Sequence, residues 1–228
     1  MKKATLIIGA GSGLSASLAR RFAEDGNRII LAARNMSSLN QLAKETDALA
    51  VQCDATQEAD IINLFNTIDD AGFSLSTMIY NAGAYTRGAV TELESSDVRR
   101  LIDVNAVGAF LAARECTNRM QRDGGSMLFT GASAGIKGYA NSSAFAMGKF
   151  ALRGLCQSLA RELAPQNIHV AHFVIDGLIY SPDRGAPYDD LQKCLDPKAI
   201  AETYFQIAAQ DRSAWTWELE LRPWLESF

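Results

Sequence analysis

Short apolar runs alternate along the chain with segments whose apolar residues recur every three or four positions. The runs lie at residues 5–8, 28–33, 49–53, 77–80, 127–130 and 169–175, with a further one at 217–221. Runs of this length, rich in branched and aromatic residues, are typical of β-strands. The segments between them have helical spacing, as in Leu14, Leu18 and Phe22, or in Ile61, Leu64, Phe65 and Ile68.

Repeated alternation of strand and helix predicts a parallel sheet, because every parallel connection needs a crossover segment. The predicted strands are continuous apolar runs, as expected where both faces of a sheet are covered. We therefore predict one doubly wound Rossmann-type α/β domain over residues 1–228, with a parallel seven-stranded sheet and helices on both faces. The least regular stretch, 181–197, contains three of the five prolines, and residues 182–197 are predicted to form a substrate loop or lid.

Composition and charge exclude several classes of partner. The 228 residues carry a formal net charge of −4, and the 22 Lys and Arg residues are scattered along the chain. Scattered charge argues against binding to nucleic acid or to an anionic membrane surface. The four cysteines lie far apart without paired spacing, so neither a disulfide framework nor a metal site is expected. A cytoplasmic location is predicted.

A glycine-rich turn follows the first predicted strand and leads directly into the first predicted helix. Its residues are Gly9, Gly11, Ser12, Gly13 and Leu14. Glycines at such a turn let the backbone approach a pyrophosphate, which then lies at the positive end of the helix. The alternative is a tight turn with no ligand, but the position in the first crossover of an alternating chain favours nucleotide binding.

The end of the second predicted strand indicates which dinucleotide is bound. A carboxylate here would hold the ribose 2′-hydroxyl of NAD, whereas a basic residue accommodates the 2′-phosphate of NADP. This chain has Ala33 followed by Arg34 and no acid. We therefore favour NADP over NAD, with a solvated surface arginine as the alternative.

These features, together with further motifs, resemble the short-chain dehydrogenase/reductase family over nearly the whole chain. The family's glycine motif, TGxxxGxG, is matched at Gly9 and Gly13, while Ile8 and Ser15 replace its threonine and last glycine. Ser15 adds bulk where the helix packs, but cofactor binding is expected to survive. The resemblance implies cofactor contacts for residues in four further segments, which are Asp54 and Ala55, Asn81, Ala82 and Gly83, Lys149, and Ile179 and Ser181.

The family's catalytic motif, YxxxK, is met only in part. Lys149 matches the lysine, which places Phe145 at the tyrosine, and Ser133 lies beside the serine position, which here is Ala132. By resemblance Lys149 holds the nicotinamide ribose and Asn105 organises a proton-relay water. The alternative for Lys149 is a side chain that reaches solvent, and for Phe145 a core aromatic.

Phe145 has no proton to give to a carbonyl oxygen, and loss of a general acid typically costs roughly 10²–10⁴-fold in rate. Tyr139, Tyr85 and Tyr180 are predicted to lie in loops near the nicotinamide. Among the replacements we favour Tyr139, or a water held by Ser133 and Asn105.

The sequence therefore predicts an NADP-dependent short-chain oxidoreductase that interconverts a small carbonyl and an alcohol by hydride transfer, with an atypical active site. The alternative is an NADP-binding sensor or scaffold protein without turnover. The resemblance also implies a homodimer or homotetramer, formed through the helices that contain Asn105 and Lys149.

Overall fold

A twisted parallel sheet forms the centre of the computed structural model, which describes residues 2–181 and 191–225. Its seven strands lie in the order β3-β2-β1-β4-β5-β6-β9, and every neighbouring pair is parallel. This confirms the predicted fold class. The strands are β1 (Lys2–Ile8), β2 (Arg28–Ala33), β3 (Leu49–Gln52), β4 (Phe73–Tyr80), β5 (Gly125–Thr130), β6 (Ile168–Ile175) and β9 (Glu218–Leu221).

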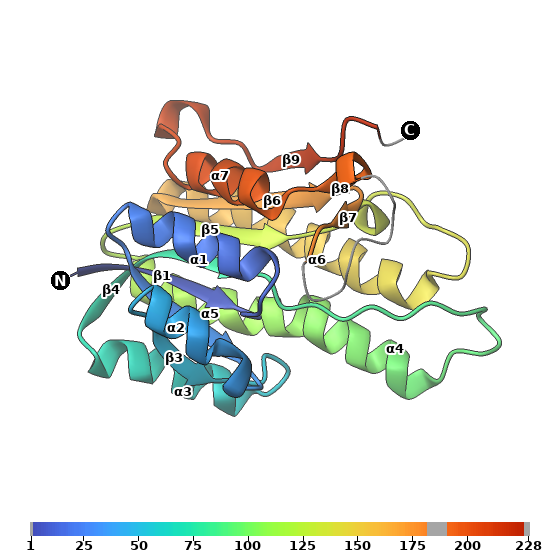
Figure 1. Ribbon diagram of the computed structural model, residues 1–228, viewed down its shortest axis with the longest axis horizontal. Helices are drawn as coiled ribbons and strands as arrows, with labels where there is room; N and C mark the ends of the chain where they lie inside the picture. The colour runs from blue at the N-terminus through green and yellow to red at the C-terminus, as the bar shows by residue number, and fades with distance from the viewer. Residues whose placement is uncertain (1, 182–190, 226–228) are drawn as a thin grey trace.

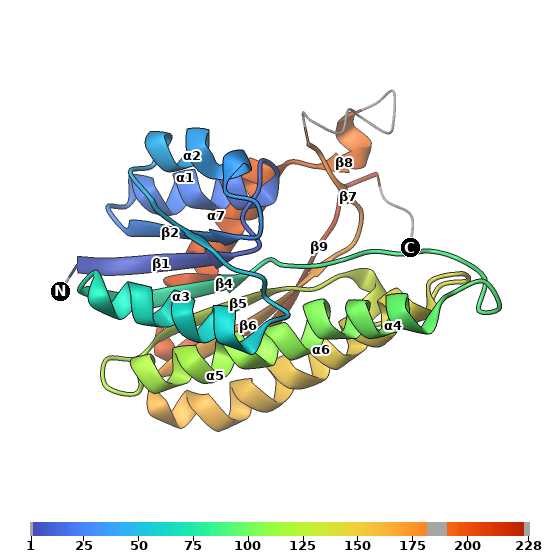
Figure 2. The same cartoon turned by 90° about the horizontal axis from the view of Figure 1, so that it is seen from below.

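Helices cover both faces of the sheet, as Figures 1 and 2 show. Figure 2 shows α1, α2 and α7 on one face and α3, α4, α5 and α6 on the other. The helices are α1 (Leu14–Glu24), α2 (Asn40–Glu45), α3 (Glu58–Asp70), α4 (Ser95–Ile102), α5 (Gly108–Met120), α6 (Ser143–Leu163) and α7 (Pro197–Ala208). None of the helices in the described part of the chain has the length and apolar character required to span a membrane.

Two apolar cores lie on the two faces of the sheet, because successive side chains of each strand point to opposite faces. In β1, for example, Leu6 and Ile8 belong to the core beneath α3, α5 and α6, whereas Ile7 belongs to the core beneath α1 and α7. All eight residues of β6 are buried. Burial on both faces explains why the strands appear in the sequence as continuous apolar runs.

The segment that was predicted to be irregular, 181–197, lies partly within the described residues. Residues 182–190 lie outside the described residues, so the predicted loop or lid is described only in its last part. There, a 3₁₀ turn (Leu191–Lys193) leads into β8 (Cys194–Leu195), which pairs in parallel with β7 (Leu178–Ile179), and Pro197 begins α7. Asp196 caps α7 by accepting a hydrogen bond from the Lys198 backbone N–H at 2.9 Å.

Candidate active site

A cleft opens at the carboxyl ends of the strands, where the connections change direction. From β1 the strand order continues through β2 and β3 to one side and through β4 and β5 to the other. Open α/β sheets bind ligands at such a switch point. The cleft has a volume of about 600 Å³ and contains most of the predicted cofactor residues, namely Gly9, Gly11, Ser12, Gly13, Leu14, Arg34, Asp54, Ala55, Asn81, Ala82, Gly83, Ile179 and Ser181.

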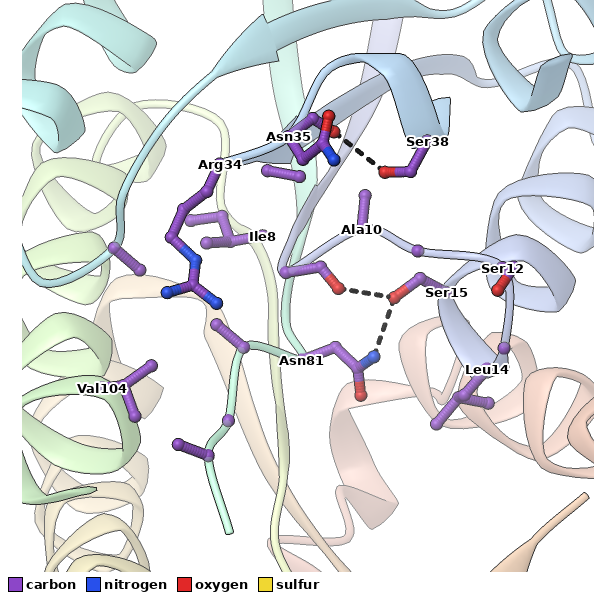
Figure 3. A pocket seen from close by; sticks show the side chains of 18 of the residues that line it. Ile8, Ala10, Ser12, Leu14, Ser15, Arg34, Asn35, Ser38, Asn81 and Val104 are labelled. Atoms are coloured by element: carbon purple, nitrogen blue, oxygen red, sulfur yellow. Dashed lines mark hydrogen bonds between the residues drawn. The ribbon is translucent and has the colours of Figure 1, made fainter. Parts of the chain in front are cut away.

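The glycine turn lies on one wall of this cleft (Figure 3). Gly9 has a φ of +86°, and a Cβ there would lie 2.3 Å from the backbone nitrogen of Ala82, so only glycine fits. A Cβ on Gly11 or Gly13 would instead meet no protein atom within 4 Å. The first turn of α1 has no acidic residue and no side-chain cap. This wall therefore fits a phosphate group at the positive end of α1.

Ser15, which replaces a glycine of the family motif, joins two turns of the cleft. Its hydroxyl donates to the carbonyl of Gly9 at 2.9 Å and accepts from Nδ2 of Asn81 at 2.7 Å (Figure 3). Ser15 is buried, with 2% of its surface exposed. This link could not be predicted from sequence, because Asn81 lies 66 residues farther along the chain.

Arg34 lies on the opposite wall, immediately after β2. Its side chain is exposed, and Figure 3 shows the guanidinium over the cleft between Asn35 and Val104. Within the described part of the chain it forms no ion pair. Free guanidinium donors fit a phosphate ester. Several residues of these walls were not predicted from the sequence, and they are Ala10, Asn35, Ser38, Cys53, Thr56, Ala84, Arg100 and Val104.

Asp54 and Ala55 form the floor of the cleft after β3. Oδ1 of Asp54 accepts hydrogen bonds from the backbone and the hydroxyl of Thr56, at 3.0 and 2.8 Å. Ala55 lies directly against α5, since a Cβ on Gly108 would approach the Ala55 carbonyl oxygen to 2.4 Å. The position of this floor is therefore fixed by α5.

Lys149, on α6, is buried beside the cleft. It is 6% exposed, and its Nζ donates to the carbonyl of Thr130 at 2.9 Å. A Cβ on Gly83, which lines the cleft, would lie 3.8 Å from this Nζ. Burial lowers the pKa of Lys149 from 10.5 to about 8, and the described residues place no carboxylate against it. The side chain does not reach solvent, contrary to the alternative considered from the sequence.

Asn105 also lies against Gly83, in an irregular helical segment between α4 and α5. A π-helical segment (Asp103–Val107) joins α4 to α5, and such segments are frequent at functional sites. Nδ2 of Asn105 donates to the carbonyls of Leu101 and Ala84, at 2.9 and 3.1 Å. Oδ1 is buried and has no partner within the described residues. An unpaired buried amide oxygen near an ammonium group is suited to hold a water or a ligand hydroxyl.

Phe145 occupies the position of the family's tyrosine, one helical turn before Lys149. Its ring centroid lies 5.8 Å from Nζ of Lys149 and 5.0 Å from the ring centroid of Tyr85, which meets it edge to face. Tyr139 lies elsewhere, with its ring centroid 5.4 Å from Nζ of Lys137. The structure therefore brings Tyr85, and not Tyr139, into contact with Phe145.

Ser133 begins a 3₁₀ turn (Ser133–Gly135) and is half-buried. Its side chain has no hydrogen bond among the described residues, and none joins it to Asn105.

Beneath this turn, His172 is fully buried between Gly131 and Glu218 and has its Nδ1 3.0 Å from Oε2 of Glu218. Burial lowers the pKa of His172. Arg153 binds the same carboxylate at 2.7 Å, so Glu218 links the edge strand β9 to α6.

Comparison with known proteins identifies this architecture. A family model described as short chain dehydrogenase matches residues 3–182. The chain belongs to the short-chain dehydrogenase/reductase family. This confirms the predicted family and the predicted class, an NAD(P)-dependent oxidoreductase of the short-chain type.

Relatives of known structure or activity extend over most of the chain. The sorbitol-6-phosphate 2-dehydrogenase of Escherichia coli is 30% identical over 191 residues, which are 80% of this chain and 74% of that protein. A crystal structure of a short-chain dehydrogenase from Rhodopseudomonas palustris is 33% identical, has a TM-score of 0.85 and covers 97% of this chain and 99% of its own. A variant of actinorhodin polyketide ketoreductase with NADPH shares the fold at 19% identity, with a TM-score of 0.89 over 100% of this chain and 98% of its own.

Proposed function

We propose that this short-chain dehydrogenase/reductase uses NADP to interconvert a small carbonyl and an alcohol in an atypical active site. The observation that carries the proposal is Lys149, a buried lysine that has no carboxylate partner among the described residues and lies beside a cleft-lining glycine. Burying an unpaired ammonium is costly and brings the fold no packing advantage over an apolar side chain. A ligand hydroxyl that accepts a further hydrogen bond from the Lys149 ammonium would offset this cost.

The cleft fits a dinucleotide along its whole length. The glycine turn and α1 would hold the pyrophosphate, Arg34 the 2′-phosphate, Asp54 and Ala55 the adenine, and the turn at 81–83 the adjacent ribose. Lys149 would hold the nicotinamide ribose, with Ile179 and Ser181 against the nicotinamide. The bound cofactor supplies the hydride. Residues at its reactive end must orient the substrate and supply a proton.

The site is atypical because Phe145 cannot donate a proton to the substrate. Lys149 and the free oxygen of Asn105 provide places for a ribose hydroxyl and a water, but Phe145 provides no acid. Without another donor, reduction would be slower by roughly 10²–10⁴-fold than in a site with a general acid. The proposed enzyme therefore requires a donor outside α6 or turns over slowly.

Arg34 supports the choice of NADP, and its substitution tests it. We expect Arg34→Ala to raise the Kd for NADPH roughly tenfold or more, because a charge-assisted hydrogen bond contributes about 1.5–3 kcal/mol. The Kd for NADH should stay within about twofold. The measurement is a fluorescence titration with each reduced cofactor. Arg122→Ala is the matched control, because the Arg122 side chain is 86% exposed and does not line the cleft.

Three outcomes separate the alternatives. Tighter binding of NADPH than of NADH, lost in Arg34→Ala alone, supports the proposed cofactor. Equal affinities that Arg34→Ala leaves unchanged would contradict it. Binding of neither cofactor would contradict a working cofactor site altogether.

An NADP-binding sensor or scaffold without turnover is the second candidate, and the absence of a hydroxyl on Phe145 favours it. NADPH oxidation in the presence of small aldehydes, ketones and keto acids separates the two functions. Turnover of any of these supports the oxidoreductase. NADPH binding without oxidation would favour the sensor or scaffold.

The proposal also includes a cytoplasmic location and assembly into a homodimer or homotetramer. All four cysteines are buried and free, as suits a reducing compartment. The outer faces of α5 and α6 and the π-helical segment expose large apolar side chains, which are Val107, Phe110, Met147 and Phe150. Such faces are typical of protein interfaces.

A further inference from the structure

Phe145 leaves the proposed reaction without a phenol on α6, so a proton donor has to come from another element. The hydroxyl of Tyr204 is buried in the core against Thr130, and Tyr80 donates to the carbonyl of Val104 at 2.7 Å. Among the described tyrosines, Tyr85, Tyr139 and Tyr180 remain. Their surroundings separate these three.

The described contacts of Tyr139 and Tyr180 are made with residues other than Phe145 and Lys149. Tyr139 interacts with Lys137, and this interaction raises the pKa of Lys137. Tyr180 lines the dinucleotide cleft, and its backbone N–H donates to the carbonyl of Leu195 at 2.9 Å. Neither ring contacts Phe145 within the described part of the chain.

Tyr85 lies next to the polar groups of the site. The residue before it, Ala84, is held by Nδ2 of Asn105 at 3.1 Å, and Gly83 lies against Oδ1 of Asn105 and Nζ of Lys149. The backbone that carries Tyr85 is therefore fixed to the two groups that would hold the ribose and a water. A hydrogen bond of this kind to the backbone next to Tyr85 helps to position its side chain.

The ring of Tyr85 rests on the ring of Phe145. The two centroids are 5.0 Å apart and the planes meet at 80°, the edge-to-face geometry that aromatic pairs prefer. Phe145 thus contacts a tyrosine from another element, one helical turn before Lys149. Tyr85 is 61% exposed, so its side chain is accessible from solvent.

We infer that the hydroxyl of Tyr85 is the general acid of this site and protonates the carbonyl oxygen of the substrate, an inference that rests on the function proposed above. In reduction, the O–H bond of Tyr85 breaks and a new O–H bond forms on the substrate oxygen. The hydride and its electron pair would come from a C–H bond of a reduced nicotinamide bound in the cleft, and they would form the new C–H bond at the carbonyl carbon. The phenolate then takes a proton from solvent. Alcohol oxidation runs the same transfers in reverse.

Tyr85→Phe tests the inference, because it removes the hydroxyl and keeps the ring on Phe145. We expect kcat for carbonyl-dependent NADPH oxidation to fall roughly 10²–10⁴-fold. The Kd for NADPH and the melting temperature should not change. Tyr139→Phe, measured in parallel, is the rival substitution.

Each outcome has one meaning. A wild-type enzyme that turns over, with the loss confined to Tyr85→Phe, supports the inference. Turnover that survives in Tyr85→Phe, or that is lost in Tyr139→Phe instead, overturns the inference and leaves the proposed function intact. A wild-type protein that binds NADPH and reduces no aldehyde, ketone or keto acid overturns the proposed function, and the role of Tyr85 with it.

Discussion

Lys149 is buried and forms a single hydrogen bond with the described residues, and this combination makes its charge costly. The Thr130 carbonyl is its acceptor, and the ring of Phe145 lies near its ammonium. With a tyrosine in place of Phe145, a phenol oxygen could share the ammonium. The phenylalanine removes that acceptor, so in the function proposed above the lysine depends more on the cofactor ribose for a partner.

The pKa of Lys149 predicts a pH dependence of folding stability. The folded pKa is about 8 and the ordinary value is 10.5, so the unfolded chain binds more protons between these pH values. Stability therefore rises with pH across this window. Relative to Lys149→Met, the wild type should gain up to roughly 3 kcal/mol in free energy of unfolding between pH 8 and 10.5.

Urea unfolding of the cofactor-free proteins across this pH range measures the gain. Lys44→Met is the control for the loss of a lysine side chain, because Lys44 lies at an exposed position of α2. A difference between wild type and Lys149→Met that is constant with pH would mean that burial does not shift the pKa of Lys149.

At the scale of elements, the apolar pattern predicted most of the sheet. The strand at 28–33 was predicted with its observed ends, because apolar and small residues fill it and Gly26 lies just before it. β4 was predicted too short. It begins at Phe73, but Ser74 and Ser76 interrupt the apolar run, and the Ser76 hydroxyl is satisfied by the Ala4 carbonyl of the neighbouring strand.

Features that depend on distant contacts could not be predicted. The π-helical segment arises where the Asn105 side chain takes the Leu101 carbonyl, and its sequence is compatible with an ordinary helix. The contact between Tyr85 and Phe145 joins two residues that are 60 positions apart in the sequence. Sequence analysis considered Tyr85 but favoured Tyr139, because motif spacing carries no information on which loop reaches α6.

Two glycines of the turn from β1 into α1 are expected to respond differently to substitution. Gly9 is packed against the protein, whereas Gly11 lines the open cleft. Gly9→Ala is expected to destabilise the fold by at least about 1 kcal/mol, because its φ is positive and its Cβ would overlap the Ala82 backbone. Gly11→Ala should leave the melting temperature unchanged, since its Cβ meets no protein atom. It should still weaken NADPH binding, since that Cβ occupies the cleft wall.

Thermal unfolding without cofactor and fluorescence titration with NADPH distinguish these effects. A Gly11→Ala variant that binds NADPH as tightly as the wild type would show that the cofactor does not approach this turn. A Gly9→Ala variant as stable as the wild type would contradict the close packing of the two turns.

For the whole molecule, the distribution of exposed apolar side chains predicts assembly. Phe110 on α5 and Phe150 on α6 are 48% and 45% exposed, on helices that cover one face of the sheet side by side (Figure 2). Met147 on α6 is 52% exposed. An unpartnered patch of large apolar residues on adjacent helices is unfavourable in water, and pairing with a second copy would bury it.

We expect light scattering with size-exclusion chromatography to give at least twice the chain mass of 24.7 kDa for the wild type. The double substitution Phe110→Glu with Phe150→Glu should shift the protein to the monomer mass, because two buried carboxylates per subunit cannot be paired at an apolar interface. Ile62→Glu is the control, since Ile62 is 38% exposed and lies on α3, which carries none of these side chains. A wild-type chain that is monomeric at micromolar concentration would contradict assembly, and a double variant that stays oligomeric would place the interface on another surface.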